Sequence, residues 1–221
     1  MILSLDTTSE FGSAALVSPK GVLEEILLHS PEGFGHILYE HIARLLAHNA
    51  IALDQIDCFA AASGPGSFTG VRVGLAAVKG LAEATAKPVV AVSNLQALAF
   101  HGTGFLRAAV IDARRGEVYG GLYDAALNTV APEIVTPFPA WVATLPDGGI
   151  EFVSVDFTPF QNALSGTRFA DAPAITVPRA LAGAIGLIAR QRLAYGQASD
   201  PAAIDANYVR RSDAELLWKD R

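Results

Sequence analysis

The stretch Gly64-Pro65-Gly66-Ser67-Phe68-Thr69-Gly70-Val71-Arg72-Val73-Gly74 decides how this chain is interpreted. It follows a short apolar run at 58–62 and precedes an alanine-rich run that ends near residue 86. That order predicts a strand, a glycine loop and the start of a helix. Such a loop directs backbone N–H groups and the positive end of a helix dipole at one point, where a phosphate could bind. The same glycines could instead serve a tight turn, through a positive φ or a close backbone approach.

The spacing of these glycines favours the tight turn. A Walker A loop is excluded because only three residues lie between Gly66 and Gly70, where that loop has four between its glycines, and no Lys-Ser or Lys-Thr follows. Glycines at 64, 66, 70 and 74 also do not match the Rossmann fingerprint. Ser67 lies outside a Gly-x-Ser-x-Gly pattern, so a nucleophile elbow has no support. We expect Gly64, Gly66 and Gly70 to form a structural loop, with phosphate binding as the alternative.

The helix predicted at about 70–86 is apolar on two opposite faces. One face carries branched residues, which are Val71, Leu75, Val78 and Ala82. The other is lined by small residues, which are Val73, Ala77, Gly80 and Ala84. We expect the branched face to pack on a sheet and the small-residue face to admit a second helix. The helix predicted at 36–48 is a candidate for that contact, either from this chain or from a partner.

Composition indicates a cytoplasmic globular protein. The chain has 221 residues, is 51% hydrophobic and has a mean hydropathy of +0.34, which suffices for one large or two small domains. Its apolar runs fall short of the roughly 20 residues that a membrane helix needs, and Met1–Asp6 lacks the basic start of a signal peptide. The single cysteine, Cys58, lies in an apolar run and is expected to be buried and inert.

Charge and histidine spacing argue against two other classes of protein. A net charge of −6 disfavours tight independent binding to nucleic acid, and the pairs Arg114-Arg115 and Arg210-Arg211 are interpreted as solvated surface charges. His36 and His41 are five residues apart, hence about 140° apart around a helix, so they cannot share a metal there. A zinc hydrolase is therefore not expected.

Two halves of the chain begin alike, which suggests an α/β fold with an internal duplication. Strands predicted at 2–5 and 12–17 flank a turn after Asp6, and strands at 107–112 and 118–123 flank a turn after Asp112. The repeat predicts two lobes, 1–101 and 102–221. Chance similarity is the alternative, because an aspartate in a turn between strands is common.

The two aspartates also raise a question about ligands. Carboxylates at the ends of strands can hold Mg²⁺ or a phosphate-bound water, and they can also cap turns. We regard Asp6, Thr7, Thr8 and Asp112 as a candidate vestigial phosphate site. Turn capping is the more conservative interpretation.

Four motifs occur together in a recognisable order. They are ILSLDTT at 2–8, GPGSFTGVRVGLAAVKGLA at 64–82, IDARRGEVY at 111–119 and YVRR at 208–211. With these motifs the chain resembles the TsaB, or YeaZ, family over essentially its whole length. The resemblance implies the actin-like ATPase (ASKHA) fold, built from two ribonuclease-H-like lobes, which agrees with the duplication inferred above.

The resemblance also implies a role in making threonylcarbamoyladenosine, the modified adenosine beside the anticodon of tRNA. In that role the family member is a non-catalytic partner of TsaD, which carries the metal and transfers the threonylcarbamoyl group. TsaE joins through the complex, and TsaC supplies the activated adenylate. The resemblance implies that the chain has no cofactor of its own and contacts tRNA only indirectly. Whether a nucleotide binds at the junction with the partner is left open. A nucleotide-binding ATPase or kinase-like enzyme of the same fold is the alternative function.

Family members also form homodimers through the surface that TsaD takes. The resemblance implies that the helices at 36–48 and 70–86 make this surface. The residues assigned to the partner interface are Ile37, Leu38, His41, Ile42, Leu45, Arg72, Val73, Ala77, Gly80 and Ala84.

Overall fold

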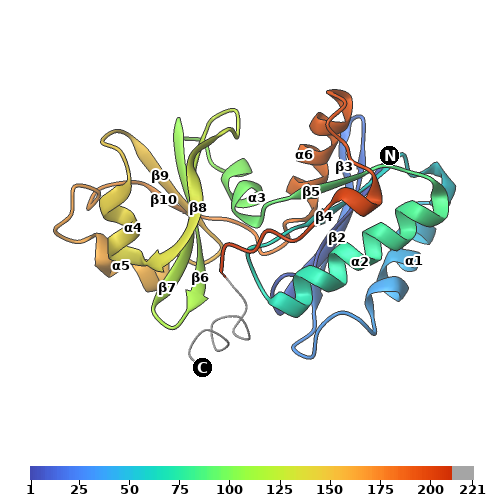
Figure 1. The fold of residues 1–221 in the computed structure, drawn as a ribbon, viewed down its shortest axis with the longest axis horizontal. Coiled ribbons are helices and arrows are strands. Elements are labelled where there is room, and N and C mark those ends of the chain that lie inside the picture. Colours follow the sequence, from blue (N-terminus) through green and yellow to red (C-terminus); the bar gives the residue numbers. More distant parts are fainter. Residues whose placement is uncertain (211–221) are drawn as a thin grey trace. The chain divides into compact units, whose positions relative to one another are not determined.

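The computed structural model describes residues 1–210 and divides into two compact α/β units. The first unit is built from Met1–Asn94 and Arg179–Asn207. The second is built from Leu95–Pro178 with residues 208–210. Each unit contains one five-stranded sheet with helices packed on it (Figure 1).

The sheet of the first unit has the strand order β3-β2-β1-β4-β5. Its strands are β1 (Ile2–Asp6), β2 (Phe11–Ser18), β3 (Gly21–His29), β4 (Cys58–Ala62) and β5 (Val89–Val92). The first three strands pair antiparallel, whereas β4 runs parallel to β1 and β5 runs parallel to β4. The central strand β1 is buried along its whole length, as expected of a strand covered on both faces.

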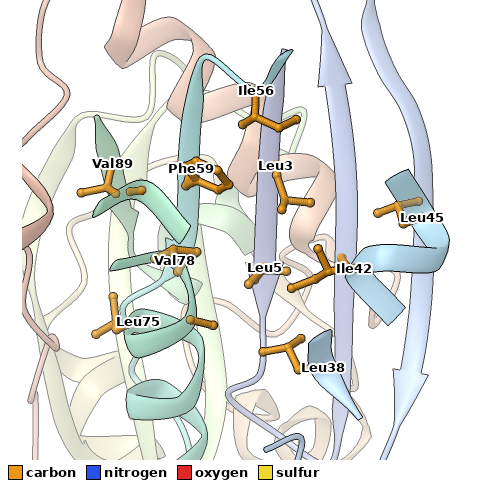
Figure 2. Packing of buried hydrophobic residues seen from close by; sticks show 14 of the residues in the cluster. Leu3, Leu5, Leu38, Ile42, Leu45, Ile56, Phe59, Leu75, Val78 and Val89 are labelled. Carbon is orange, nitrogen blue, oxygen red and sulfur yellow. The ribbon is translucent and has the colours of Figure 1, made fainter. Parts of the chain in front are cut away.

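Helices cover both faces of this sheet, and β1 shows how the sequence divides them. Leu3 and Leu5 point to the face that carries α1 (Leu38–His48) and α2 (Phe68–Thr85), as Figure 2 shows. Ser4 points to the other face, where its Oγ donates to the Ala182 carbonyl at 2.7 Å, at the start of α6 (Ala182–Ala194). This alternation follows from the two-residue period of a strand.

The branched face of α2 packs on the sheet, as predicted. Its four residues are at most 5% exposed and belong to the hydrophobic core of the first unit, namely Val71, Leu75, Val78 and Ala82.

The single cysteine lies in the neighbouring strand β4. Cys58 is fully buried, and burial raises the pKa of its thiol to about 12, which confirms the expected inert thiol.

The sheet of the second unit has the order β10-β9-β6-β7-β8. Its strands are β6 (Leu106–Arg114), β7 (Glu117–Asp124), β8 (Thr129–Pro137), β9 (Ile150–Ser154) and β10 (Ala174–Thr176). The helices α4 (Phe138–Thr144) and α5 (Thr158–Leu164) contribute to an aromatic core, in which the rings of Phe138 and Phe160 stack 4.9 Å apart.

The two sheets repeat one topology, which confirms the duplication. In each half, three antiparallel strands are followed by a helix, a parallel strand, a second helix and another parallel strand. Thus β6 takes the place of β1 and β9 takes the place of β4. The similarity that the sequence shows only around Asp6 and Asp112 extends to the order of all ten strands.

The last helix of each half packs in the unit built by the other half. α3 (Asn94–Phe100) follows β5, yet from Leu95 onward it belongs to the second unit, where Arg107 Nη1 donates to the Ala99 carbonyl at 3.1 Å. α6 follows β10, yet it lies on the sheet of the first unit. The units therefore differ from the predicted lobes 1–101 and 102–221 by this exchange of helices.

In the second half, β8, α5 and β10 were not predicted from the sequence. β8 is an edge strand that contains Pro132 and lacks a clean alternation of buried and exposed residues. α5 and β10 are too short to show a hydrophobic period. α1 and α2 begin at Leu38 and Phe68, each two residues from the predicted start. None of the helices within residues 1–210 is long and apolar enough to cross a membrane.

Replacement of Ile42 by alanine tests whether α1 is part of the core of the first unit. The Ile42 side chain is 3% exposed and packs in the cluster with Leu3 and Leu5. We expect Ile42→Ala to lower the free energy of unfolding by about 2–5 kcal/mol, because it leaves a cavity. Urea unfolding measures the change, and Ala47→Ser on the exposed side of α1 should cost less than about 0.5 kcal/mol. Equal costs would show that α1 does not pack as described.

Candidate functional site

The turn after β1 is organised around the buried carboxylate of Asp6. Asp6 is 3% exposed, and its Oδ1 accepts hydrogen bonds from the Thr8 backbone N–H at 2.9 Å and from the Thr8 hydroxyl at 2.7 Å. Burial raises the pKa of the Asp6 carboxyl above its ordinary value, although the hydrogen bonds from Thr8 and Asn94 act in the opposite direction. The arrangement is an Asx turn that holds the chain in one conformation.

Asn94 joins this turn to the glycine loop. Its Nδ2 donates to Thr8 Oγ1 at 2.7 Å and reaches Asp6 Oδ1 at 3.4 Å, while its Oδ1 accepts from the Gly64 N–H at 3.1 Å. The Asn94 N–H also donates to the Gly64 carbonyl at 2.9 Å. Asn94 is the first residue of α3. Its role in joining two distant loops depends on the tertiary structure, because 88 residues separate it from Asp6.

The glycines of the loop and of α2 let two backbones touch. A Cβ on Gly66 would lie 2.6 Å from the Thr8 carbonyl oxygen, and one on Gly70 would lie 2.0 Å from that of Thr7. A Cβ on Gly74 would lie 2.6 Å from Thr7 Oγ1. Gly64 differs from these three, because its φ of +99° lies in the left-handed region. The glycines therefore serve a close approach between the start of α2 and the turn after β1.

The hydroxyl hydrogens of Thr7 and Thr8 are donated within the chain. The Thr7 hydroxyl donates to the Gly70 carbonyl at 2.7 Å, and the Thr8 hydroxyl donates to Asp6. The Ser67 N–H donates to the Thr8 carbonyl at 2.7 Å, and Ser67 Oγ accepts from the Gly70 N–H at 3.3 Å. A hydroxyl has one hydrogen to donate, so neither threonine hydroxyl retains one for a phosphate. These contacts favour the structural interpretation of the loop.

Asp112 lies in the second unit, whereas Asp6, Thr7 and Thr8 lie in the first. The Asp112 side chain is exposed, and its Oδ1 accepts from the Arg114 N–H at 2.8 Å. Through this hydrogen bond, the aspartate again caps a turn. Both aspartates therefore cap turns, and the vestigial phosphate site formed by them stays a prediction.

The residues assigned to the partner interface divide into three groups by exposure. Four are buried in the core of the first unit, namely Leu38, Ile42, Leu45 and Ala77. Three are half-buried, namely Ile37, His41 and Val73. The other three are exposed, namely Arg72, Gly80 and Ala84. The buried four stabilise α1 and α2 on the sheet, and only the half-buried and exposed six reach the surface.

The exposed sides of α1 and α2 carry large side chains that the sequence analysis missed. Tyr39 on α1 is 56% exposed and Phe68 on α2 is 41% exposed. The guanidinium carbon of Arg72 lies 3.7 Å from the centre of the Phe68 ring, a cation–π contact. Next to this pair along α2, the exposed residues Ala76, Gly80 and Ala84 have small side chains or none, so nothing projects from the helix there. We call Ile37, Tyr39, His41, Phe68, Arg72, Val73, Gly80 and Ala84 the two-helix surface.

The histidines form no cluster with other potential metal ligands. Within residues 1–210, no three His, Cys, Asp or Glu side chains are grouped so that they could hold a metal ion. His48 instead contacts Glu24 of β3, with its Nδ1 2.9 Å from the carboxylate oxygen. This hydrogen bond and one from Asn49 hold the pKa of Glu24 below its usual range. These contacts attach the end of α1 to the edge strand.

Comparison with known proteins identifies the family. A family model described as TsaD, tRNA N6-adenosine threonylcarbamoyltransferase, matches residues 32–171. The tRNA threonylcarbamoyladenosine biosynthesis protein TsaB of Bacillus subtilis is 28% identical over 98% of this chain and 97% of its own length. The Escherichia coli protein of the same name is 36% identical over 58% of this chain and 57% of its own length. The chain belongs to the TsaB, or YeaZ, family.

A solved member of the TsaB family shares the fold. YeaZ from Pseudomonas aeruginosa is 27% identical, superposes with a TM-score of 0.77, and the match covers 94% of this chain and 98% of that chain. The two sheets of this TsaB-family chain are accordingly the ribonuclease-H-like lobes of the actin-like fold, as expected.

Two glycines of α2 provide a matched test of the close backbone contact. A methyl group at Gly70 would meet the Thr7 carbonyl oxygen, whereas one at Gly80 would meet nothing within 4 Å. We expect Gly70→Ala to lower the free energy of unfolding by roughly 1–3 kcal/mol through overpacking. Gly80→Ala should raise it by about 0.8–1 kcal/mol through helix propensity. Urea unfolding of both variants measures the difference, and effects of the same sign would contradict the described contact.

The raised pKa of Asp6 makes its contribution to stability depend on pH. The folded protein binds this proton more tightly than the unfolded chain, whose carboxyl titrates near 3.8. Stability from Asp6 should therefore fall as the pH rises above 3.8 and level off above the folded pKa. Asp6→Asn keeps an Oδ1 acceptor for Thr8 and removes the charge. The stability of Asp6→Asn relative to wild type should rise between pH 3 and 8 in urea unfolding, and a flat or falling difference would refute the pKa shift.

Proposed function

We propose that this chain acts in threonylcarbamoyladenosine biosynthesis on tRNA, as a non-catalytic partner of TsaD. The observation that carries the proposal is the similarity to TsaB of Bacillus subtilis along nearly the whole chain. The match of residues 32–171 to the TsaD family model agrees with it, because it relates this chain to the family of the proposed partner. The two-helix surface supplies a place for such a contact.

The turn after β1 supports a structural role in preference to phosphoryl chemistry. A kinase-like site needs free donors and a cation beside the phosphates. In this chain the hydroxyl hydrogens of Thr7 and Thr8 are donated to Gly70 and Asp6, and the loop that could cradle a phosphate packs on the turn instead. These contacts weigh against the ATPase or kinase-like alternative.

The two-helix surface has the chemistry of a protein interface. Aromatic residues and arginine contribute most binding energy at interfaces, and here Tyr39, Phe68 and Arg72 are exposed on two helices that pack on the same face of the sheet. Small residues let a partner helix approach, since the distance between helix axes depends on the side chains at the contact. Gly80 lies among the small residues of α2 with open space around it.

We infer that TsaD and a second copy of this chain compete for the same surface. A homodimer through α1 and α2 would cover the aromatic residues when the chain is alone. TsaD would then displace one of the two copies, and TsaE would join the resulting heterodimer.

Mixing the chain with its cognate TsaD tests the proposed function. Size-exclusion chromatography with light scattering should show a heterodimer at micromolar concentration. Reconstituted tRNA modification with TsaD, TsaE and TsaC should require this chain. Failure to form the complex, or full modification without the chain, would refute the proposal.

Replacement of Gly80 by leucine separates partner binding from folding. The substitution fills open space on an exposed helix, so the chain itself should become slightly more stable. At the two-helix surface the larger side chain should overpack the contact by roughly 1–3 kcal/mol, a loss of about five- to 150-fold in affinity for TsaD. Titration calorimetry measures the affinity, and thermal unfolding measures the stability.

Gly149→Leu is the matched control for that variant. Gly149 is exposed in the second unit, and a Cβ there would also meet nothing within 4 Å. Its replacement should leave the affinity for TsaD unchanged. Normal TsaD binding by Gly80→Leu would place the interface elsewhere on the chain.

A further inference from the structure

The turn between β6 and β7 carries two arginines in an unfavourable backbone conformation. Arg114 pairs with Glu117, so Arg115 and Gly116 form a two-residue hairpin loop. Arg115 and Gly116 have φ values of +57° and +77°, as a type I′ turn requires, and Arg114 also has a φ of +66°. Such turns favour asparagine followed by glycine, because bulky residues are strained at positive φ. Backbone preference therefore does not explain arginine at 114 and 115.

A β-bulge and the end of the described chain hold this turn in place. The register of β6 and β7 shifts between Asp112 and Arg114, so Ala113 is the extra residue of a bulge. The Ala113 carbonyl accepts from Arg210 Nη1 at 2.9 Å, and the Arg210 guanidinium also pairs with the Glu117 carboxylate. Asp112 Oδ1 accepts from the Arg114 N–H. Contacts on both strands thus hold the turn in its strained conformation, and such strained turns are often found at functional sites.

Two basic segments that lie far apart in the sequence meet at this turn. Arg114 and Arg115 are both exposed, and Arg210 joins them through its contacts with Ala113 and Glu117. Arg211 lies outside the described residues. Asp112 and Glu117 are the acidic groups of the same turn, and Glu117 is paired with Arg210. Among these groups, three arginines stand beside two carboxylates, in a chain whose net charge is −6. We call Arg114, Arg115 and Arg210 the arginine turn.

We propose that the arginine turn contacts the phosphate backbone of the tRNA substrate. Guanidinium groups bind phosphates with two parallel hydrogen bonds, which is why arginine is common where phosphates are recognised. The turn projects two exposed arginines from a hairpin tip, which suits the repeated charges of a polynucleotide. The proposal rests on the proposed function in tRNA modification. It goes beyond that function, because the family resemblance implies only an indirect contact with tRNA.

Arg115→Asn distinguishes this role from a structural one. Asparagine is preferred at this position of a type I′ turn, so the variant should have an equal or higher melting temperature. If Arg115 contacts a phosphate, the complex of this chain with TsaD should bind tRNA roughly two- to fivefold more weakly. The slope of log Kd against log salt concentration for this complex should decrease by about one, which is the value for one lost phosphate contact. Arg114→Gly should act in the same way.

The measurement uses the purified complex and an in vitro transcript of a tRNA that reads ANN codons, titrated at several salt concentrations. Lys20→Gln is the control for charge, because Lys20 is exposed in the turn between β2 and β3. It should leave the affinity and the salt slope unchanged. Arg115→Lys should retain the salt slope, because it retains the charge.

Three results would overturn the proposal. The first is an unchanged tRNA affinity in both Arg115→Asn and Arg114→Gly. The second is a loss of tRNA affinity in Lys20→Gln equal to that in Arg115→Asn. The third is a loss of tRNA affinity in Arg115→Lys as large as in Arg115→Asn, together with a lower melting temperature of Arg115→Lys. The test also remains distinct from that of the proposed function. A chain that forms no complex with TsaD refutes the function, whereas a normal complex with unchanged tRNA affinity in both arginine variants refutes only the arginine turn.

Discussion

The contact between the start of α2 and the turn after β1 is the constraint on which the first unit depends. Two backbones approach so closely there that a methyl group at Gly70 would lie 2.0 Å from the Thr7 carbonyl oxygen. Hydrogen bonds from Ser67 and Thr7 close the same contact from both sides. Because this contact positions the first turn of α2, it also decides which residues of the 18-residue helix face the sheet and which face outward.

The same contact explains how a loop with the appearance of a phosphate cradle can serve another purpose. A phosphate site needs N–H and hydroxyl groups that point into an open space. Here the Thr7 hydroxyl donates to a carbonyl, the Thr8 hydroxyl and N–H donate to Asp6, and the backbone of the turn packs against the loop. Close packing and ligand binding compete for the same donors. Asn94 strengthens the packed arrangement, because its side chain bonds both loops at once.

The duplication was predicted from a short similarity, but its full extent needed the structure. Strand–Asp–turn–strand patterns around Asp6 and Asp112 indicated two related halves. The strand orders show that the whole topology is repeated. The exchange of α3 and α6 between the units could not be predicted, because hydrophobic periodicity shows that a helix is covered but not which sheet covers it. The first eight residues of α6 are all apolar and seven of them are buried, so this part of the helix has no polar face that would orient it.

By itself, the amino-acid sequence determined the elements with strong local signals and the family. The strands β1 and β4, the helices α1 and α2 and the branched face of α2 follow from hydrophobic period and glycine placement, which act over a few residues. Only the tertiary structure decided which apolar residues of α1 and α2 belong to the core, because one helix can bury Ile42 and expose Tyr39 three positions away. It also decided that Asn94 joins Asp6 to Gly64, and that Arg210 meets Ala113. These contacts join residues far apart in the chain, so no local pattern could encode them.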